Sequence, residues 1–188
     1  MSRLLDPALL TTATGEQWLV DRAVKGDEEA FRTLYETYYN KTFAICKGIL
    51  LNSEEAEDIV QEVFLLAHKN LRRFDRRAKF STWLFRIAVN RSIQESRKSK
   101  YKAQTYTLTD EVTDTVAGPE EPSTVDPAIE SAMSRLHEAD RAVLTLFYWD
   151  ELSLEDIGAT LGCSSNAAKT RLFRARERFR EAYEGALS

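Results

Sequence analysis

Apolar residues recur at three- and four-residue steps through much of the first hundred residues, which is the period of amphipathic helices. A short helix is expected around 16–25, and Gly26 separates it from a longer one. The buried face of the longer helix is expected to hold Phe31, Leu34, Tyr35, Tyr38 and Thr42. Asn52 and Ser53 are suited to cap a third helix. That helix should end near Asn70 and bury Ile59, Val63 and Leu66.

The segment 72–80 has no helical period and is expected to be a loop, after which Ser81 or Thr82 begins a helix to about Lys100. From residue 103 the chain becomes rich in Thr, Asp, Glu and Pro, and no period survives. This composition is typical of a flexible linker. The helical pattern resumes at Asp126, which can cap a helix that has Pro127 at its first position.

The remaining pattern predicts helices over 139–149, over 154–161, and from Ser165 to about Tyr183. The middle one begins after Ser153, with Asp156 as its capping-box partner. The predicted fold class is therefore all-α, with two small helical domains joined by a flexible acidic linker. The predicted boundaries are an N-terminal extension over 1–15, a first domain over 16–102, the linker over 103–127 and a second domain over 128–188.

The last two predicted helices have the form of a helix-turn-helix, because a short capped helix, a turn with glycine and a longer basic helix follow one another. Gly158 and Ala168 allow close approach, and Gly162 permits the sharp turn. The inward stripe is expected to be Ala168, Leu172, Ala175 and Phe179. The outward face is then Ser165, Asn166, Lys169, Thr170, Phe173 and Arg174, whose groups can read base edges in a major groove. Phosphates or solvent would be reached by Arg171, Arg176, Arg178 and Arg180. The alternative is an ordinary amphipathic helix with an Arg-rich surface.

The chain of 188 residues has 26 Lys and Arg against 30 Asp and Glu, and the resulting net charge of −4 would by itself disfavour nucleic acid as a partner. The charge is unevenly distributed, however. Residues 69–102 carry 12 basic and 2 acidic side chains, whereas 1–68 carry 6 basic and 12 acidic ones. The net charge is −6 over 103–127, −5 over 128–162 and +3 over 163–188. Two positive segments therefore alternate with three negative ones, although any charge run can also be a solvated face.

The basic segment 69–102 is interleaved with the aromatic residues Phe74, Phe80, Trp83, Phe85 and Tyr101. Cations alone suffice to neutralise phosphates, whereas aromatic rings among them favour a surface that stacks unpaired bases. Stacking of a base on an aromatic side chain contributes about 1–3 kcal/mol, and unstacking a base from the duplex costs a few kcal/mol. Opening a dozen base pairs would therefore need a larger protein assembly. The alternative is that Phe80, Trp83 and Phe85 fill a small core, which is the interpretation we favour for Phe85.

An acidic and polar stripe precedes this basic segment, and its members Asp58, Gln61, Glu62 and Leu65 share one helix face opposite the apolar one. The stripe is either a docking site for a basic protein or a solvated face. Cys46 and Cys163 have no Cys or His at ligand spacing, so we expect neither a metal site, a cofactor nor a disulfide framework. No apolar run reaches the roughly 20 residues that cross a bilayer, and residues 1–14 lack a signal-peptide core. We expect a cytoplasmic protein without membrane insertion.

A resemblance to bacterial extracytoplasmic-function (ECF, group IV) sigma factors of the sigma-70 family is carried by motifs in both domains. Their region 2 core resembles Glu57-Asp58-Ile59-Val60-Gln61-Glu62-Val63-Phe64 and Phe80-Ser81-Thr82-Trp83-Leu84-Phe85-Arg86-Ile87-Ala88-Val89-Asn90. Their region 4 resembles Ser153-Leu154-Glu155-Asp156-Ile157-Gly158 and Ala168-Lys169-Thr170-Arg171-Leu172-Phe173-Arg174-Ala175-Arg176. The matches cover roughly 27–100 and 128–183, and the linker lies where this group lacks region 3.

The resemblance implies a dissociable factor without catalysis that gives core RNA polymerase its specificity for promoter DNA. The clamp helices of the polymerase β′ subunit would be bound by Asp58, Gln61, Glu62 and Leu65, and region 4 would meet the β flap. The −10 element would be recognised and opened through Arg76, Lys79, Phe80, Trp83, Arg86, Asn90 and Arg91. The −35 element would be read by Ser165, Asn166, Lys169, Thr170, Arg171, Phe173 and Arg174. The acidic linker would thread the polymerase channels, and an anti-sigma factor is a further expected partner.

Two other function classes compete with this interpretation. A stand-alone regulator would bind operators as a dimer, but no dimer face is evident. A nuclease or recombinase would need its acids at 54–58 around a metal, but neighbouring residues on a helix point to different faces, and His68 and His137 are isolated. Because the charges of the domains and the linker are opposite, we also expect the free chain to be partly self-masked, with its basic surfaces against Asp110–Asp126 or an anti-sigma partner.

Overall fold

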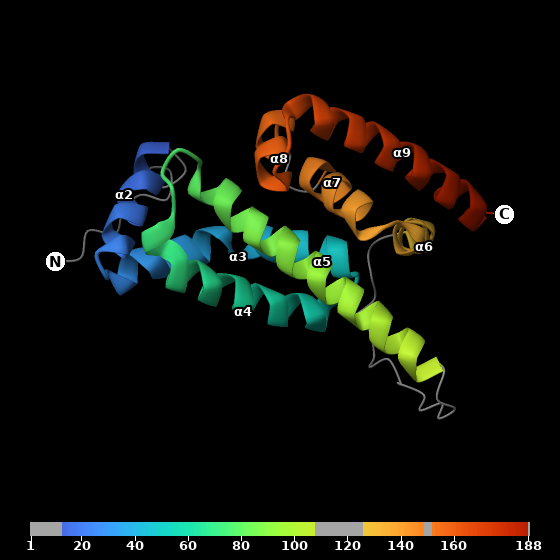
Figure 1. The fold of residues 1–188 in the computed structure, drawn as a ribbon, viewed down its shortest axis with the longest axis horizontal. Helices are drawn as coiled ribbons and strands as arrows, with labels where there is room; N and C mark the ends of the chain where they lie inside the picture. Colours follow the sequence, from blue (N-terminus) through green and yellow to red (C-terminus); the bar gives the residue numbers. More distant parts are fainter. Residues whose placement is uncertain (1–12, 108–125, 149–151, 188) are drawn as a thin grey trace.

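The protein is described by a computed structural model over residues 13–107, 126–148 and 152–187, and the described elements are all helices. The first unit comprises α2 (Ala13–Val24), α3 (Glu28–Leu50), α4 (Ser53–Asn70), a short 3₁₀ turn (Leu71–Arg73) and α5 (Phe80–Thr107). The second comprises α6 (Pro127–Arg135), α7 (Glu138–Tyr148), α8 (Leu154–Leu161) and α9 (Ser165–Leu187). The all-α fold in two helical units is thus confirmed (Figure 1).

The helix starts are set by side-chain oxygens, as the sequence predicts for three of them. Asn52 accepts a hydrogen bond from the Glu55 backbone N–H at 3.0 Å, and Asp126 accepts one from Ala128 N–H at 2.9 Å. The Ser153 hydroxyl accepts from Asp156 N–H at 3.1 Å and donates to the Asp156 carboxylate at 2.8 Å. Each of these caps satisfies a donor that has no partner within its own helix.

Both ends of α5 differ from the sequence-based expectation. Helix α5 begins at Phe80 rather than at Ser81 or Thr82, because the Phe80 backbone N–H finds its acceptor on α2, in the side chain of Glu16. The same helix continues to Thr107, so 103–107 are helical although composition placed them in the linker. Residues 108–125, which hold most of the predicted linker, lie outside the described residues.

The core of the first unit is formed where α3, α4 and α5 pack together. The apolar stripes of α4 and α3 are buried as predicted at Ile59, Val63 and Leu34, each at most 3% exposed. Phe85 on α5 is 2% exposed and belongs to this core, as we favoured from the sequence. Helix α2 packs along α3 and also contacts α5 and the 3₁₀ turn, so it braces the segment that connects α4 to α5.

The helix-turn-helix of the second unit has the local structure that the sequence predicts. Gly162 ends α8 in the left-handed region (φ 67°). A Cβ atom on Gly158 would lie 2.8 Å from the Cys163 carbonyl oxygen, so only glycine fits against the turn. Ala168, Leu172 and Ala175 of α9 are buried, while Phe179 is half-buried. The turn and the first half of α9 are therefore held rigidly against α8.

The two units pack directly on one another and share a continuous core. Helix α7 lies against α3, and α8 lies against α5, with α9 along the outer side of the second unit (Figure 1). The helices approach closely at Gly48 on α3, where a Cβ atom would lie 2.7 Å from Thr145 Cγ2 and 3.1 Å from Thr145 Cβ. The sequence predicted two units on a tether, and it gave no sign of this packing.

We predict that Gly158→Ala lowers the stability of the second unit by about 1–3 kcal/mol, because the new methyl group meets turn backbone that cannot move aside. Denaturant unfolding followed by circular dichroism measures the effect. Gly185→Ala is the matched control: its Cβ would meet only the flexible end of Arg135, and alanine favours helix by about 1 kcal/mol. Equal stability of wild-type protein and Gly158→Ala would contradict the prediction.

Candidate nucleic-acid interface

The side chains predicted to read the −35 element all lie exposed at the N-terminal half of α9, opposite its buried stripe. Phe173 is 64% exposed although it is apolar. The Ser164 hydroxyl caps the helix at Ala167 N–H (3.2 Å), and the Thr170 hydroxyl donates to the Asn166 carbonyl oxygen (3.0 Å). The exposed set is Ser165, Asn166, Lys169, Thr170, Arg171, Phe173 and Arg174. A rigid helix thus presents donors, acceptors and cations on one accessible face.

Three of the arginines assigned to phosphates or solvent have partners within the protein. Arg178 donates two hydrogen bonds to the buried Asp140 carboxylate, at 2.8 and 2.9 Å. The Arg176 guanidinium stacks on Phe147 and Tyr148, 4.7 and 5.2 Å from the ring centroids. Arg180 pairs with Glu177, one turn earlier, at 2.7 Å. The second half of α9 is therefore committed largely to packing, and only its first half presents an open reading face.

The side chains predicted to contact the −10 element lie along the loop before α5 and on its first three turns, where several are already engaged. Arg76 lies 2.6 Å from the Asp21 carboxylate of α2. Arg91 donates to Glu62 on α4 (Nε to Oε2, 3.1 Å). Asn90 is exposed and Trp83 half-buried. The predicted set thus lies within one stretch of the chain, but its side chains point to different neighbours: Arg76 to α2, Lys79 and Arg86 to α8, and Arg91 to α4.

Phe80 does not belong to the accessible surface, and its assignment to DNA contact is corrected here. Its side chain is only 1% exposed and packs among the rings of Tyr38, Phe74 and Trp83 at centroid distances of 5.7, 6.0 and 5.7 Å. An aromatic residue in a basic segment is compatible with either stacking on bases or packing in a core. Because the ring of Tyr38 on α3 packs against it, Phe80 is a core residue.

The acidic and polar stripe of α4 is exposed along its whole length. Asp58, Gln61 and Glu62 lie on the surface, and Leu65 beside them is 70% exposed. Glu62 also accepts the hydrogen bond from Arg91, so the stripe and the −10 region share one ion pair. An exposed leucine within an acidic stripe is suited to contact a partner that offers both apolar and basic groups.

Charged side chains also join the two units. Lys79 donates to both Asp156 oxygens on α8, at 3.0 and 3.2 Å, and Lys100 donates to Glu138 on α7 at 2.7 Å. Burial raises the pKa of each of these carboxyls, but the lysine hydrogen bonds and charges lower it by more, so both pKa values lie below the ordinary range. Both carboxylates are consequently charged at neutral pH, and both ion pairs are present.

Arg86 and Arg141 extend the contact between the units. Arg86 donates to the backbone carbonyl oxygens of Ala159 and Thr160 at the end of α8. The buried Arg141 of α7 donates to the Ser96 hydroxyl of α5 at 3.0 Å. Within the described residues, Arg141 Nε and Thr145 Oγ1 are buried without a hydrogen-bond partner. Buried donors that lack partners are costly, so this interface is less well satisfied than an interior core.

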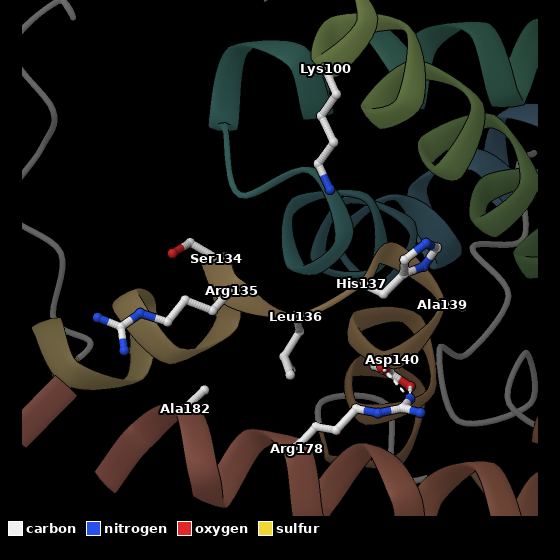
Figure 2. A pocket seen from close by; sticks show the side chains of 9 residues that line it. All are labelled: Lys100, Ser134, Arg135, Leu136, His137, Ala139, Asp140, Arg178 and Ala182. Atoms are coloured by element: carbon white, nitrogen blue, oxygen red, sulfur yellow. Dashed lines mark hydrogen bonds and ion pairs between the residues drawn. The ribbon is translucent and has the colours of Figure 1, made fainter. Parts of the chain in front are cut away.

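A cavity of about 570 Å³ opens at the junction of α5, α6, α7 and α9 (Figure 2). Figure 2 shows Lys100 reaching in from α5 and the Arg178–Asp140 ion pair closing the opposite side. Two cations that line the cavity are thus neutralised by acids of α7: Lys100 by Glu138, and Arg178 by Asp140. The cavity marks the seam between the two units.

No local sequence pattern indicates the contacts that α2 and α3 contribute. Glu16 and Asp21 of α2 bind the start of α5 and the preceding loop, and Gly48 makes room for α7. All three contacts depend on which helices become neighbours. Among the described residues, we find neither a group of three or more metal-binding side chains nor a helix long and apolar enough to span a membrane.

A helix-turn-helix with an exposed reading face, joined to a basic helical unit, defines a DNA-binding protein. Comparison with known proteins identifies the family of DNA-binding proteins. The family of sigma-70 region 2 matches residues 34–101, and the family of sigma-70 region 4 matches residues 127–179. The two matches fall on the two helical units.

Full-length relatives agree with both matches. The ECF RNA polymerase sigma factor SigW of Bacillus subtilis (strain 168) is 37% identical over 177 residues, which cover 86% of this chain and 93% of SigW. The ECF RNA polymerase sigma-E factor of Escherichia coli (strain K12) is 30% identical over 175 residues, covering 86% and 91%. The chain therefore belongs to the ECF sigma factors of the sigma-70 family, which direct promoter-specific transcription initiation.

Solved structures share the fold. CnrH, in complex with the cytosolic domain of CnrY, has a TM-score of 0.69 at 21% identity and covers 93% of this chain and 99% of its own. RpoE of Bartonella quintana, in complex with the anti-sigma factor NepR, has a TM-score of 0.64 at 23% identity, covering 82% and 96%. At these identities the likeness establishes the arrangement of helices.

We predict that Arg178→Ala destabilises the second unit by about 1–2 kcal/mol, because it leaves the buried Asp140 carboxylate unpaired. Part of the full cost of breaking a buried pair is avoided, since the Arg178 side chain is 57% exposed. Thermal unfolding measures the change. The control Arg180→Ala removes an exposed pair within one helix and should alter stability by less than about 0.5 kcal/mol. Equal effects of the two substitutions would refute the structural role of Arg178.

Proposed function

We propose that the three exposed surfaces divide the work of promoter recognition. The N-terminal half of α9 reads the −35 element, the loop before α5 and its first turns bind and open the −10 element, and the α4 stripe docks on the clamp helices of the β′ subunit. The second unit meets the β flap, and the linker between α5 and α6 follows the polymerase channels. The observation that carries this proposal is the complete exposure of the predicted reading face on a helix whose opposite side is packed.

The protein acts in the cytoplasm. It has no catalytic activity of its own, because the polymerase supplies both the chemistry and most of the energy that opens the promoter. Stacking of one or two captured bases contributes about 1–3 kcal/mol each, which offsets local unstacking but not the opening of a whole bubble. An anti-sigma factor is the further partner that we propose, since RpoE was solved with the anti-sigma factor NepR bound.

Run-off transcription tests the proposed function most directly. Purified protein with core RNA polymerase should yield discrete transcripts from a library of genomic fragments, and start-site sequencing should reveal two shared elements. Binding of the protein alone to specific operators, with no effect on polymerase, would instead indicate a stand-alone regulator.

We predict that Lys169→Ala and Arg174→Ala change which −35 bases are preferred, with about 1–3 kcal/mol of discrimination lost at the base each residue contacts. Transcription from a library randomised at the −35 element measures the preference. Arg180→Ala is the control, because Arg180 lies on the part of α9 that is paired within the helix. An unchanged base preference in both variants would remove α9 as the reading helix.

The contact between the two units also suggests how the free protein is kept from DNA. Lys79 and Arg86, both assigned to the −10 element, are bound to α8. The unsatisfied Arg141 Nε and Thr145 Oγ1 favour an interface that opens. We therefore propose that α8, together with any masking by residues 110–126, engages Lys79 and Arg86 of the −10 surface until core polymerase separates the units.

We predict that Gly48→Ala opens the protein, because its methyl group cannot be accommodated beside Thr145 while helix propensity in α3 improves by about 1 kcal/mol. The radius of gyration from small-angle X-ray scattering should increase, and free protein should bind promoter DNA several-fold more tightly. Lys47→Ala, an exposed neighbour on the same helix, should change neither quantity. A compact Gly48→Ala variant with unchanged DNA affinity would contradict the masking proposal.

A further inference from the structure

Helix α2 holds the −10 region at two points. The Glu16 Oε1 atom accepts a hydrogen bond from the Phe80 backbone N–H at 3.0 Å, and its second oxygen accepts one from the Tyr38 hydroxyl. Further along α2, the Asp21 carboxylate lies 2.6 Å from the Arg76 guanidinium. One helix thus binds both the loop that precedes α5 and the first residue of α5.

The Glu16 contact does for α5 what capping residues do for the other helices. The first N–H groups of a helix have no acceptor within it and need one from elsewhere. Lys79 precedes Phe80 and has no acceptor in its side chain. Glu16 supplies that acceptor from a separate helix, and its negative charge suits the positive end of the helix dipole. The position of the first turn of α5 is therefore set by α2.

The contact reaches the surface through a chain of aromatic rings. Tyr38, which donates to Glu16, packs on Phe80 at 5.7 Å; Phe80 packs on Trp83 at 5.7 Å; and Trp83 packs on Phe74 at 5.1 Å. Burial raises the pKa of Tyr38, and the hydrogen bond and charge of Glu16 raise it further. The phenol consequently remains protonated and continues to donate. Phe80 is buried, so it transmits the position of Glu16 to Trp83 and the loop.

We propose that Glu16 is a positioning residue for promoter opening: it fixes the first turn of α5 so that Trp83 and the loop from Phe74 to Lys79 meet the −10 bases in one geometry. Glu16 itself touches no DNA in this role. The inference rests on the proposed function of α5 in −10 recognition, and it assigns to α2 a part in that step.

The test uses holoenzyme assembled from the full chain and core polymerase, on a promoter obtained with wild-type protein by run-off selection. Glu16→Ala removes the acceptor for both Phe80 and Tyr38. The loss of one helix cap corresponds to a factor of about 5 in an equilibrium. We therefore expect about fivefold fewer open complexes, measured by permanganate reactivity of −10 thymines, with unchanged affinity for core polymerase.

Two comparisons separate positioning from general stability. A template with a mismatched, already opened −10 region should restore transcription by Glu16→Ala to within about twofold of wild type, because opening is then no longer required. Glu16→Gln keeps a carbonyl acceptor for Phe80 N–H, and the Tyr38 hydroxyl can turn to accept from its amide. Glu16→Gln should therefore open the duplex promoter to within about twofold of wild type.

Normal opening by Glu16→Ala would overturn the inference. So would a joint loss of core binding and opening, or a failure of the opened template to restore transcription, because either result makes Glu16 a general stability residue. If wild-type holoenzyme selects no promoter at all, the proposed function fails first and the inference falls with it.

Discussion

The approach of α7 to α3 at Gly48 is the constraint on which the arrangement of this protein depends. Only a residue without a side chain lets Thr145 come so close. Because α7 seats there, α8 is carried onto α5, and Asp156 and the carbonyl oxygens of Ala159 and Thr160 meet Lys79 and Arg86. The close approach at Gly48 thus determines which cations of the first unit find acceptors on the second.

The polar contacts across the interface that results have small net energies. Its ion pairs are partly exposed, with the Lys79 and Lys100 side chains 63% and 53% accessible, and such pairs contribute little in water. Its buried part includes the Arg141 guanidinium, whose burial is offset by few hydrogen bonds. Contacts of this kind would suit the proposed opening of the two units on core polymerase.

The net charge of −4 describes a cancellation rather than a surface. The structure adds that acidic side chains of one element repeatedly neutralise basic ones of another: Asp21 with Arg76, Glu62 with Arg91, and Asp156 with Lys79. Each of these basic residues is assigned to DNA, and each acid lies on a different helix. The Glu62–Arg91 pair is notable because Glu62 belongs to the stripe proposed for polymerase and Arg91 to the surface proposed for DNA, so the two surfaces are adjacent and share a charge.

Helix periods, caps and the glycine turn were readable from the sequence because each is decided within a few residues: Asn52, Asp126 and Ser153 cap as predicted, and the outward face of α9 follows from its inward stripe. Contacts between helices that are far apart in the sequence could not be predicted, because no local pattern indicates which helices become neighbours. Local pattern alone predicts DNA contact for Phe80 and phosphate or solvent contact for Arg178, whereas the structure places Tyr38 beside Phe80 and Asp140 beside Arg178. The sequence by itself determined the helices, the exposed faces and the family. Only the tertiary structure decided that Glu16 accepts the first backbone N–H of α5 and that α7 packs against α3 at Gly48. Both contacts join helices that are far apart in the sequence, so no local pattern predicts them.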